Sequence, residues 1–327
     1  MTDSGSIPII DIAGLRSAHP ADRFAVGSAL RSASIGSGFF YVTNHGISET
    51  LRKTVLREAE RFFALPQEEK GKVDSSLSRC GRGYEPLRNQ QLEHGAPPDV
   101  KEGFQIGVDL PPNHPRVLAG VFGQGPNLWP GDLPGWRETM EEYSAQMSGL
   151  AVLMMRGMAL SLGLTEDAFE GFCDEPTTML RLLHYPPQPS NAKPREKGCG
   201  EHTDWGALTF LYQDDVGGLE IWNEQLGWLP ATPIPGTYVV NIGDMMARWT
   251  NDRYHSTLHR VVNHSGRERY SIPFFYDGRP DHVVSCLSNC LEPGANPKYP
   301  PITSAEHLAE MYRRTYTNVP ESSGLVR

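Results

Sequence analysis

The stretch from residue 179 to residue 275 most constrains the fold, because it is divided into short apolar segments at close spacing. Glycine, aspartate and asparagine separate these segments, as in Asp214-Asp215-Val216-Gly217-Gly218. Many short strands separated by such turn residues are typical of a β-sandwich or a jelly roll. We expect 219–222 to pair back across that turn onto 208–212. The predicted strands are 179–185, 208–212, 219–222, 228–230, 237–242, 257–262 and 268–275.

Strands and helices alternate in the first half of the chain. The β-prone runs 7–12 and 38–44 predict strands, and the spacing of apolar residues predicts helices over 21–32 and 48–65. The longest helix is expected over 136–164, where an apolar stripe indicates a core-facing side rather than a ligand-binding box. The stripe consists of Met140, Tyr143, Met147, Leu150, Met154 and Met158. With a last helix over 304–316, the predicted fold class is α+β, a β-rich core flanked by helices.

Residues 73–133 are rich in glycine, proline and asparagine and have little periodicity. Gly81-Arg82-Gly83 does not form a dinucleotide-binding loop, because no helix and no third glycine follow in register. A long irregular connection of this kind is often a binding loop or a lid. A plain surface loop is equally consistent with the sequence.

Composition narrows the possible partners. The formal net charge is -9 at pH 7, and the sequence has no basic stripe of the kind that follows nucleic-acid phosphates. Five scattered cysteines without a Cys-x-x-Cys pair indicate free thiols in a reducing compartment. Neither a signal peptide nor a membrane-spanning apolar run is evident. We therefore expect a cytoplasmic protein that binds a small molecule, and neither nucleic acid nor a membrane; its oligomeric state is left open.

A candidate metal site begins with His202 and Asp204. These residues stand at i and i+2, so in an extended backbone their side chains leave the same face. His259 is the expected third ligand because it lies in a β-prone run, whereas His255 and His264 lie in turn-like sequence. Two histidines and one carboxylate form a facial triad that suits Fe(II) and leaves coordination positions open. From these residues alone, two core histidines and a surface acid remain the alternative.

Arg269 and Ser271 form a candidate anion site. They also stand at i and i+2, on a segment expected to return from His259 as a hairpin. A guanidinium matches a carboxylate, and the hydroxyl adds a second donor. An inward-facing arginine in an apolar strand needs an anionic partner, since an unpaired buried charge is costly. A bound carboxylate ligand and an acidic residue elsewhere in the fold would each meet that need.

Together with three further motifs, these residues resemble the isopenicillin N synthase-like family of iron(II)/2-oxoglutarate dioxygenases. The further motifs are Asn44-His45-Gly46, Asn241-Ile242-Gly243-Asp244 and His259-Arg260-Val261. The resemblance covers nearly the whole chain and implies a double-stranded β-helix, which is a jelly roll. It implies four parts of one compact unit, namely an N-terminal portion 1–115, a long helix within 116–174, a catalytic jelly roll 175–280 and a C-terminal extension 281–327.

The resemblance also implies an enzyme and its site residues. The implied cofactors are iron(II) and 2-oxoglutarate, with O2 as the second co-substrate. The implied reaction is the oxidation, most often hydroxylation, of a small molecule with release of succinate and CO2. The implied iron ligands are His202, Asp204 and His259, and the residues implied to hold 2-oxoglutarate are Arg269, Ser271 and Tyr185.

One residue departs from the family pattern. Leu183 stands where the family often has an asparagine, two residues before the matching Tyr185. Two alternatives therefore stay open: an iron oxidase or cyclase of the isopenicillin N synthase type, which uses no 2-oxoglutarate, and a non-catalytic ligand-binding member of the fold.

The substrate is expected between the mouth of the barrel and the irregular residues 73–110. The candidate walls, each equally consistent with ordinary core, are Tyr84, Phe104, Trp205 and Phe275. Arg82 and Arg248 are candidates for contact with an anionic substrate.

Overall fold

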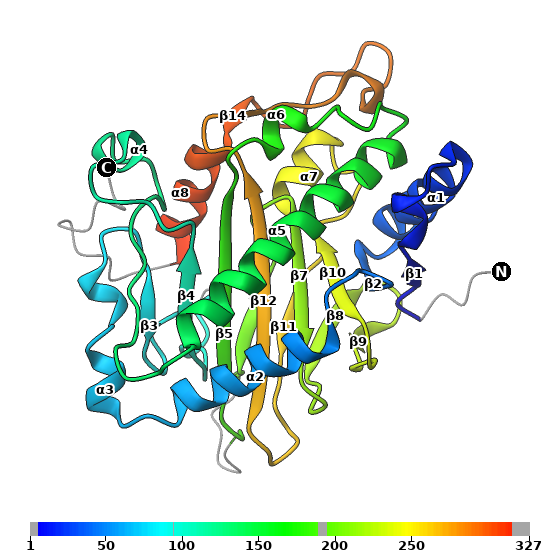
Figure 1. The fold of residues 1–327 in the computed structure, drawn as a ribbon. Coiled ribbons are helices and arrows are strands. Elements are labelled where there is room, and N and C mark those ends of the chain that lie inside the picture. The colour runs from blue at the N-terminus through cyan, green and yellow to red at the C-terminus, as the bar shows by residue number, and fades with distance from the viewer. Residues whose placement is uncertain (1–5, 94, 189–194, 316–327) are drawn as a thin grey trace.

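The β-rich half forms two sheets that face each other. The structure, a computed structural model, describes residues 6–93, 95–188 and 195–315. Within these residues an eight-stranded sheet has the order β1-β2-β10-β7-β12-β5-β4-β3, and a four-stranded sheet has the order β6-β11-β8-β9. β13 and β14 form a separate pair. This arrangement, with helices outside it (Figure 1), confirms the predicted α+β class and the jelly-roll core.

The larger sheet consists of β1 (Ile9–Asp11), β2 (Phe39–Thr43), β10 (Tyr238–Ile242), β7 (Leu208–Gln213), β12 (Arg269–Gly278), β5 (Thr177–Tyr185), β4 (Glu102–Gly107) and β3 (Gly83–Glu85). The smaller sheet consists of β6 (Cys199–His202), β11 (His259–Val261), β8 (Leu219–Asn223) and β9 (Gly227–Pro230). The remaining pair is β13 (Val283–Val284) and β14 (Ile302–Thr303). The helices are α1 (Pro20–Gly36), α2 (Glu49–Phe63), α3 (Gln67–Gly71), α4 (Pro115–Leu118), α5 (Trp136–Ser161), α6 (Glu170–Cys173), α7 (Asp244–Trp249) and α8 (Ser304–Thr315).

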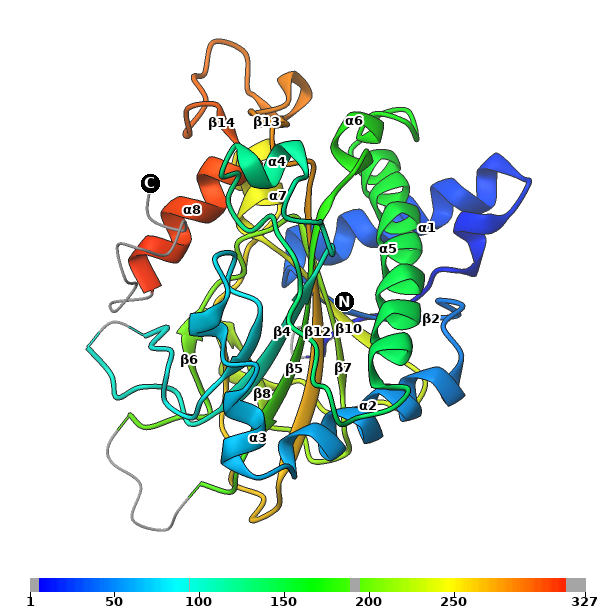
Figure 2. The ribbon, with the colours of Figure 1, turned by 60° about the vertical axis from the view of Figure 1, so that its left-hand side comes forward.

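Helices cover one face of the larger sheet. In Figure 1, α5 runs across the front of this sheet, with α2 below it, and Figure 2 shows both helices on the side away from β6 and β8. The predicted apolar stripe of α5 is fully buried against the sheet, which confirms its core-facing role. α2 begins at the expected place because the Ser48 hydroxyl caps it, accepting the Leu51 backbone N–H at 3.1 Å.

The alternation of side chains along β12 separates the core from the site. Ile272, Phe274 and Tyr276 are fully buried in the cluster beneath the helices. The odd-numbered residues leave the opposite face, toward the smaller sheet, because successive side chains of a strand alternate. This inner face carries Arg269 and Ser271 at the start of the strand and Phe275 near its end.

Two predicted hairpins are wrong. β8 pairs with β11 and β9 rather than with β7, and β12 pairs with β5 and β7 rather than with β11. In both cases the connecting turn carries the chain from one sheet to the facing sheet. Arg269 therefore faces the smaller sheet that holds His259 across the interior of the jelly roll, rather than along one sheet.

The region 73–133 is more ordered than its composition indicated. β3 and β4 extend the edge of the larger sheet, with Gly83 opposite Gln105 and Phe104 opposite Leu182 of β5. These two strands were not predicted, because glycines at 83, 103 and 107 interrupt the alternation of apolar and polar side chains. The turns and short α4 that follow lie beside the same edge (Figure 2).

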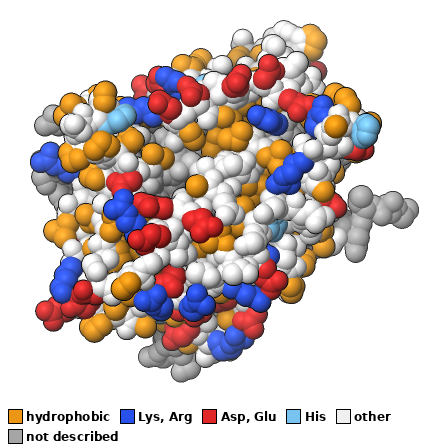
Figure 3. All heavy atoms as spheres, in the orientation of Figure 1, with side chains coloured by type: hydrophobic (Ala, Val, Ile, Leu, Met, Phe, Trp, Pro, Cys, Tyr) orange, Lys and Arg blue, Asp and Glu red, His pale blue; other side chains and the backbone are white. Residues whose placement is uncertain are grey.

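The surface and the cysteines add further findings. On the face shown in Figure 3, acidic and basic side chains lie interspersed with apolar ones. All five cysteines are free thiols. In the described part of the chain, no helix is long and apolar enough to cross a membrane. The predicted cytoplasmic location and the four-part division of the chain stay predictions.

Candidate metal centre and adjoining cavity

His202 and His259 face each other as a cross-strand pair of the smaller sheet. The His202 Nδ1 atom lies 2.7 Å from the Gly200 carbonyl oxygen, and the His259 Nδ1 atom lies 3.1 Å from the Thr257 carbonyl oxygen. An Nδ1–H that donates to a carbonyl leaves the lone pair on Nε2. Both imidazoles therefore present an acceptor nitrogen to the interior, as metal-binding histidines do.

Asp204 completes the group. Its Oδ1 atom lies 3.8 Å from His202 Nε2 and 3.7 Å from His259 Nε2, too far for hydrogen bonds. The ligand atoms of the three residues all lie within 4.8 Å of one another. Two nitrogen lone pairs and a carboxylate oxygen that converge without bonding to each other fit a divalent cation, and the set is the facial triad typical of Fe(II) oxygenases.

The protonation states favour metal binding. Burial, with His202 nearby, lowers the pKa of His259 to about 4, while Asp204 opposes this shift. Burial alone would raise the pKa of Asp204, but the facing imidazoles and the Asn241 amide hold it below its usual value. Asn241 Nδ2 donates to Asp204 Oδ2 at 2.7 Å, which leaves Oδ1 directed at the histidines. At neutral pH the site thus offers a neutral His259 imidazole and a carboxylate.

A second set of contacts holds β6 in place. Asp99 Oδ1 accepts the Gly200 backbone N–H at 2.9 Å, and Gly200 is also the residue whose carbonyl orients His202. Lys101 forms a buried ion pair with Asp99, and its Nζ atom lies 3.5 Å from Cys199 Sγ. A buried cation is tolerated here because the carboxylate neutralises it.

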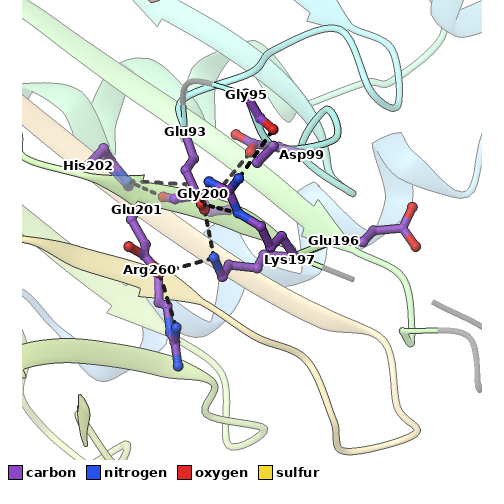
Figure 4. Close-up of polar contacts among 12 residues, drawn as sticks. Glu93, Gly95, Asp99, Glu196, Lys197, Gly200, Glu201, His202 and Arg260 are labelled. Carbon is purple, nitrogen blue, oxygen red and sulfur yellow. Dashed lines mark hydrogen bonds and ion pairs between the residues drawn. The ribbon is translucent and has the colours of Figure 1, made fainter. Parts of the chain in front are cut away.

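An ion pair also joins β6 and β11, on the face that the alternation of side chains places opposite the metal centre. Figure 4 shows the residues of this pair and their neighbours. Glu201 and Arg260, the neighbours of His202 and His259, meet at 3.1 Å. Lys197 links Glu201, at 3.0 Å, to Glu93, at 2.6 Å. These pairs fix the register in which the two histidines stand opposite each other.

Arg269 is buried without an acidic partner. It is fully inaccessible, and its guanidinium donates to the Gly217 carbonyl, to Ser271 Oγ at 3.2 Å and to Gln213 Oε1 at 3.3 Å. The Tyr185 ring lies 4.7 Å beneath the guanidinium carbon. Among the described residues no carboxylate forms an ion pair with Arg269. Between the two partners that the sequence allowed, this arrangement favours a bound anion.

The strand register brings the other predicted residues to Arg269 and Ser271. Tyr185 stands opposite Arg269, and Leu183 stands opposite Ser271. Leu183 is buried in the apolar cluster between the two sheets. The residue that departs from the family pattern therefore supplies an apolar contact beside the Arg269 site, where an asparagine would supply hydrogen bonds.

A cavity of about 120 Å3 adjoins the triad. His202 and Asp204 form part of its wall, as do Trp205 and Phe275, two of the four predicted substrate contacts. Tyr84 and Phe104, the other two, lie in the core beneath α2 and α5, because β3 and β4 direct these side chains away from the smaller sheet.

The two arginines considered for an anionic substrate also differ. Arg82 is buried in the wall of the cavity, whereas Arg248 lies outside it, stacked on Tyr299. Arg82 Nη2 donates to the Gly123 carbonyl oxygen at 2.6 Å, and Nη1 contacts Met179 Sδ at 3.3 Å.

Sequence reasoning missed several polar residues of this region. Asp277 and Gln105 line the cavity, and Asp99 holds the Gly200 backbone that orients His202. Asn241 was named as part of a motif, but its bond to Asp204 was not predicted. Burial, with the charge of Asp204 nearby, raises the pKa of Asp277 to about 7, and the Arg82 guanidinium opposes the rise. The period of two that relates Arg269 to Ser271 would have found Asp277 if it had been followed along the strand.

Residues 7–132 match the family described as the non-haem dioxygenase in morphine synthesis N-terminal region, and residues 176–278 match the 2OG-Fe(II) oxygenase superfamily. The chain is 43% identical over 314 residues to the 2-oxoglutarate-Fe(II) type oxidoreductase hxnY of Emericella nidulans, covering 94% of this chain and 90% of the relative. The chain belongs to the 2-oxoglutarate-Fe(II) oxygenase superfamily. This membership confirms the predicted enzyme class and the cofactors iron(II), 2-oxoglutarate and O2.

Other members of the superfamily extend the comparison. The homoarginine-6-hydroxylase 2-ODD-233 of Oryza sativa subsp. japonica is 38% identical over 323 residues, which cover 94% of this chain and 97% of that protein. Among solved structures, a full-length Neurospora crassa protein in complex with alpha-KG and thymine superposes with a TM-score of 0.84 at 29% identity, covering 96% of this chain and 98% of that one.

Proposed function

We propose that this oxygenase couples the oxidation of 2-oxoglutarate to the oxidation, most often hydroxylation, of a small molecule that binds in the cavity beside His202 and Asp204. The observation that carries the proposal is Arg269, a buried guanidinium with no acidic partner among the described residues. It lies on β12, whose Phe275 lines the same cavity as His202 and Asp204. A dicarboxylate could meet the metal with one end and Arg269 with the other.

The site residues have two separate roles, binding the iron and binding 2-oxoglutarate. His202, Asp204 and His259 hold the iron, which when bound supplies the means to activate O2 and oxidise a C–H bond. Arg269 binds the far carboxylate of 2-oxoglutarate through its N–H groups, Ser271 adds a hydroxyl donor, and Tyr185 supports the guanidinium from below. Each of these groups acts by placement, and none of them has to exchange a proton.

The cavity supports a substrate site distinct from the Arg269 pocket. Trp205 and Phe275 line the cavity, whereas Arg269 and Ser271 do not. Apolar walls keep water away from the metal, which limits side reactions. Relatives named as homoarginine-6-hydroxylases and a structural neighbour bound to thymine support a small-molecule substrate and a hydroxylation.

A succinate-release assay tests the proposal. Purified enzyme with Fe(II), 2-oxoglutarate and O2 should release succinate, slowly alone and faster with an accepted substrate, and a chelator should stop the release. Asp204→Ala should abolish it, whereas Asp215→Ala, at an exposed aspartate paired with Arg267, should leave it unchanged. O2 consumption without succinate would favour an oxidase of the isopenicillin N synthase type, and no O2 consumption at all would favour a binding protein.

A further inference from the structure

Asp277 occupies an unusual position at the end of β12. Tyr276 pairs with Thr178 of β5 and Gly278 pairs with Thr177, so Asp277 is an extra residue without a cross-strand partner. Such β-bulges redirect side chains and are common next to active sites. Asp277 lines the cavity on the same face of β12 as Phe275.

The Asp277 carboxylate lacks a hydrogen-bond donor. The residue is only 6% exposed, yet no side chain or backbone N–H of the described residues donates to its carboxylate. The guanidinium of Arg82 is a nearby charge, but it donates to Gly123 and contacts Met179 instead, and no ion pair joins it to Asp277. Neither oxygen is among the fully enclosed polar atoms without a partner, because the carboxylate faces the cavity. A ligand in the cavity can therefore supply the donor that the described residues do not.

The charge and size of the cavity restrict that ligand. Arg82 is positively charged, and Asp277 is negatively charged at a pH above its pKa of about 7. Under that condition a cationic ligand would face Arg82 and an anionic ligand would face Asp277. The other arginine of the wall, Arg181, is paired with Glu85. An uncharged ligand avoids both repulsions. A volume of about 120 Å3 is close to that of cavities that hold a single benzene-sized ring. The aromatic side chains of Trp205 and Phe275 provide apolar surface for such a ring.

We propose that Asp277 accepts a hydrogen bond from the N–H of an uncharged, single-ring substrate of the lactam type, and so selects the substrate and orients it toward the metal centre. A lactam carries its N–H beside a carbonyl, which matches a carboxylate beside a guanidinium. Asp277 is in this role a specificity-determining residue. The proposal rests on the proposed function, because it takes the cavity beside the triad as the substrate site.

The test uses a matched series of five-membered rings. The probes are 2-pyrrolidinone, N-methyl-2-pyrrolidinone without the N–H, pyrrolidine as the cation and cyclopentanecarboxylate as the anion. Each is titrated into the full chain loaded with Mn(II) and 2-oxoglutarate, and paramagnetic relaxation of the probe protons reports binding near the metal. At a pH of about 8, above the pKa of about 7 of Asp277, 2-pyrrolidinone should bind about tenfold more tightly than its N-methyl counterpart, as expected for a hydrogen bond to a charged acceptor.

Substitutions assign the preference to Asp277. Asp277→Leu should remove the preference for the N–H probe, and Asp277→Asn, which keeps an acceptor oxygen without the charge, should retain part of it. Asp281→Asn is the control, since Asp281 is exposed on the same segment and pairs with Arg279. Circular dichroism and thermal unfolding check that each variant folds.

Three results would overturn the proposal. They are equal binding of the two lactams by the unsubstituted enzyme, an unchanged preference in Asp277→Leu, and tighter binding of the cation or the anion than of 2-pyrrolidinone. Failure of the proposed function is distinguishable, because the enzyme would then not bind Mn(II) and 2-oxoglutarate at the triad at all. Normal loading with no lactam preference would reject only the role of Asp277.

Discussion

Replacing Arg269 by methionine should remove most of the affinity for 2-oxoglutarate while leaving the metal centre intact. Methionine keeps much of the side-chain volume but none of the N–H donors. Truncating one partner of a buried, hydrogen-bonded charge pair typically costs about 2–5 kcal/mol. The dissociation constant of 2-oxoglutarate should therefore rise by roughly 30-fold to several thousand-fold.

Ligand-induced stabilisation gives the assay. At a concentration 100 times its dissociation constant, 2-oxoglutarate should raise the free energy of unfolding of the Mn(II)-loaded enzyme by about 2.7 kcal/mol. If Arg269→Met weakens binding 100-fold, the same concentration should contribute only about 0.4 kcal/mol. Thermal unfolding with and without the ligand measures both values. Arg267→Met is the control, because Arg267 is exposed and pairs with Asp215. Equal stabilisation of Arg269→Met and the unsubstituted enzyme would refute the assignment.

Three further predictions concern stability and metal binding. The neutral His45 ring accepts the Ile47 N–H on Nδ1, and burial lowers the pKa of His45 to about 4. Below a pH of about 6.5 the unfolded chain binds a proton at His45 that the folded protein does not bind. The free energy of unfolding should therefore fall by about 1–2 kcal/mol as the pH drops from about 6.5 toward 4. His45→Gln should flatten this part of the stability curve measured by denaturant unfolding, and an unchanged curve would contradict the reasoning. Gly278→Ala should destabilise the fold by about 2–5 kcal/mol, because φ is +69° and the new Cβ would lie 2.0 Å from the Phe172 ring. A midpoint of urea unfolding equal to that of the unsubstituted protein would contradict this prediction. Asn241→Leu should weaken metal binding about 10- to 100-fold in a Mn(II) titration, since Asn241 orients Asp204; full affinity would show that Asp204 needs no such support.

Local patterns predicted much of this molecule. The stripe of α5, the position of α2 and most strands of the jelly roll follow from periodicity and turn residues, which act within one segment. The i, i+2 relation placed His202 with Asp204 and Arg269 with Ser271, because an extended backbone directs both side chains of such a pair to one face. β6 itself ends at His202, and Asp204 follows it. The same relation extends to Phe275 and Asp277 on β12.

The pairing between distant segments could not be predicted from local sequence patterns. Nothing in the spacing of residues indicates that His259 stands opposite His202 or that the chain changes sheets after β7 and after β11. Tyr84 and Phe104 were expected near the substrate, but the face they occupy depends on how β3 and β4 join the edge of the larger sheet. The bulge at Asp277 likewise could not be predicted, because it is defined by the pairing of β12 with the distant strand β5.

The central claim is that His202, Asp204 and His259 bind the iron to which 2-oxoglutarate binds in turn. An anaerobic titration of the Fe(II)-loaded enzyme with 2-oxoglutarate, followed by visible absorption, tests it most directly. We predict a charge-transfer band that saturates at one equivalent, shifts to much higher concentration in Arg269→Met, and is absent in His202→Ala and Asp204→Ala. The same band in either triad variant, or none in the unsubstituted enzyme, would contradict the claim.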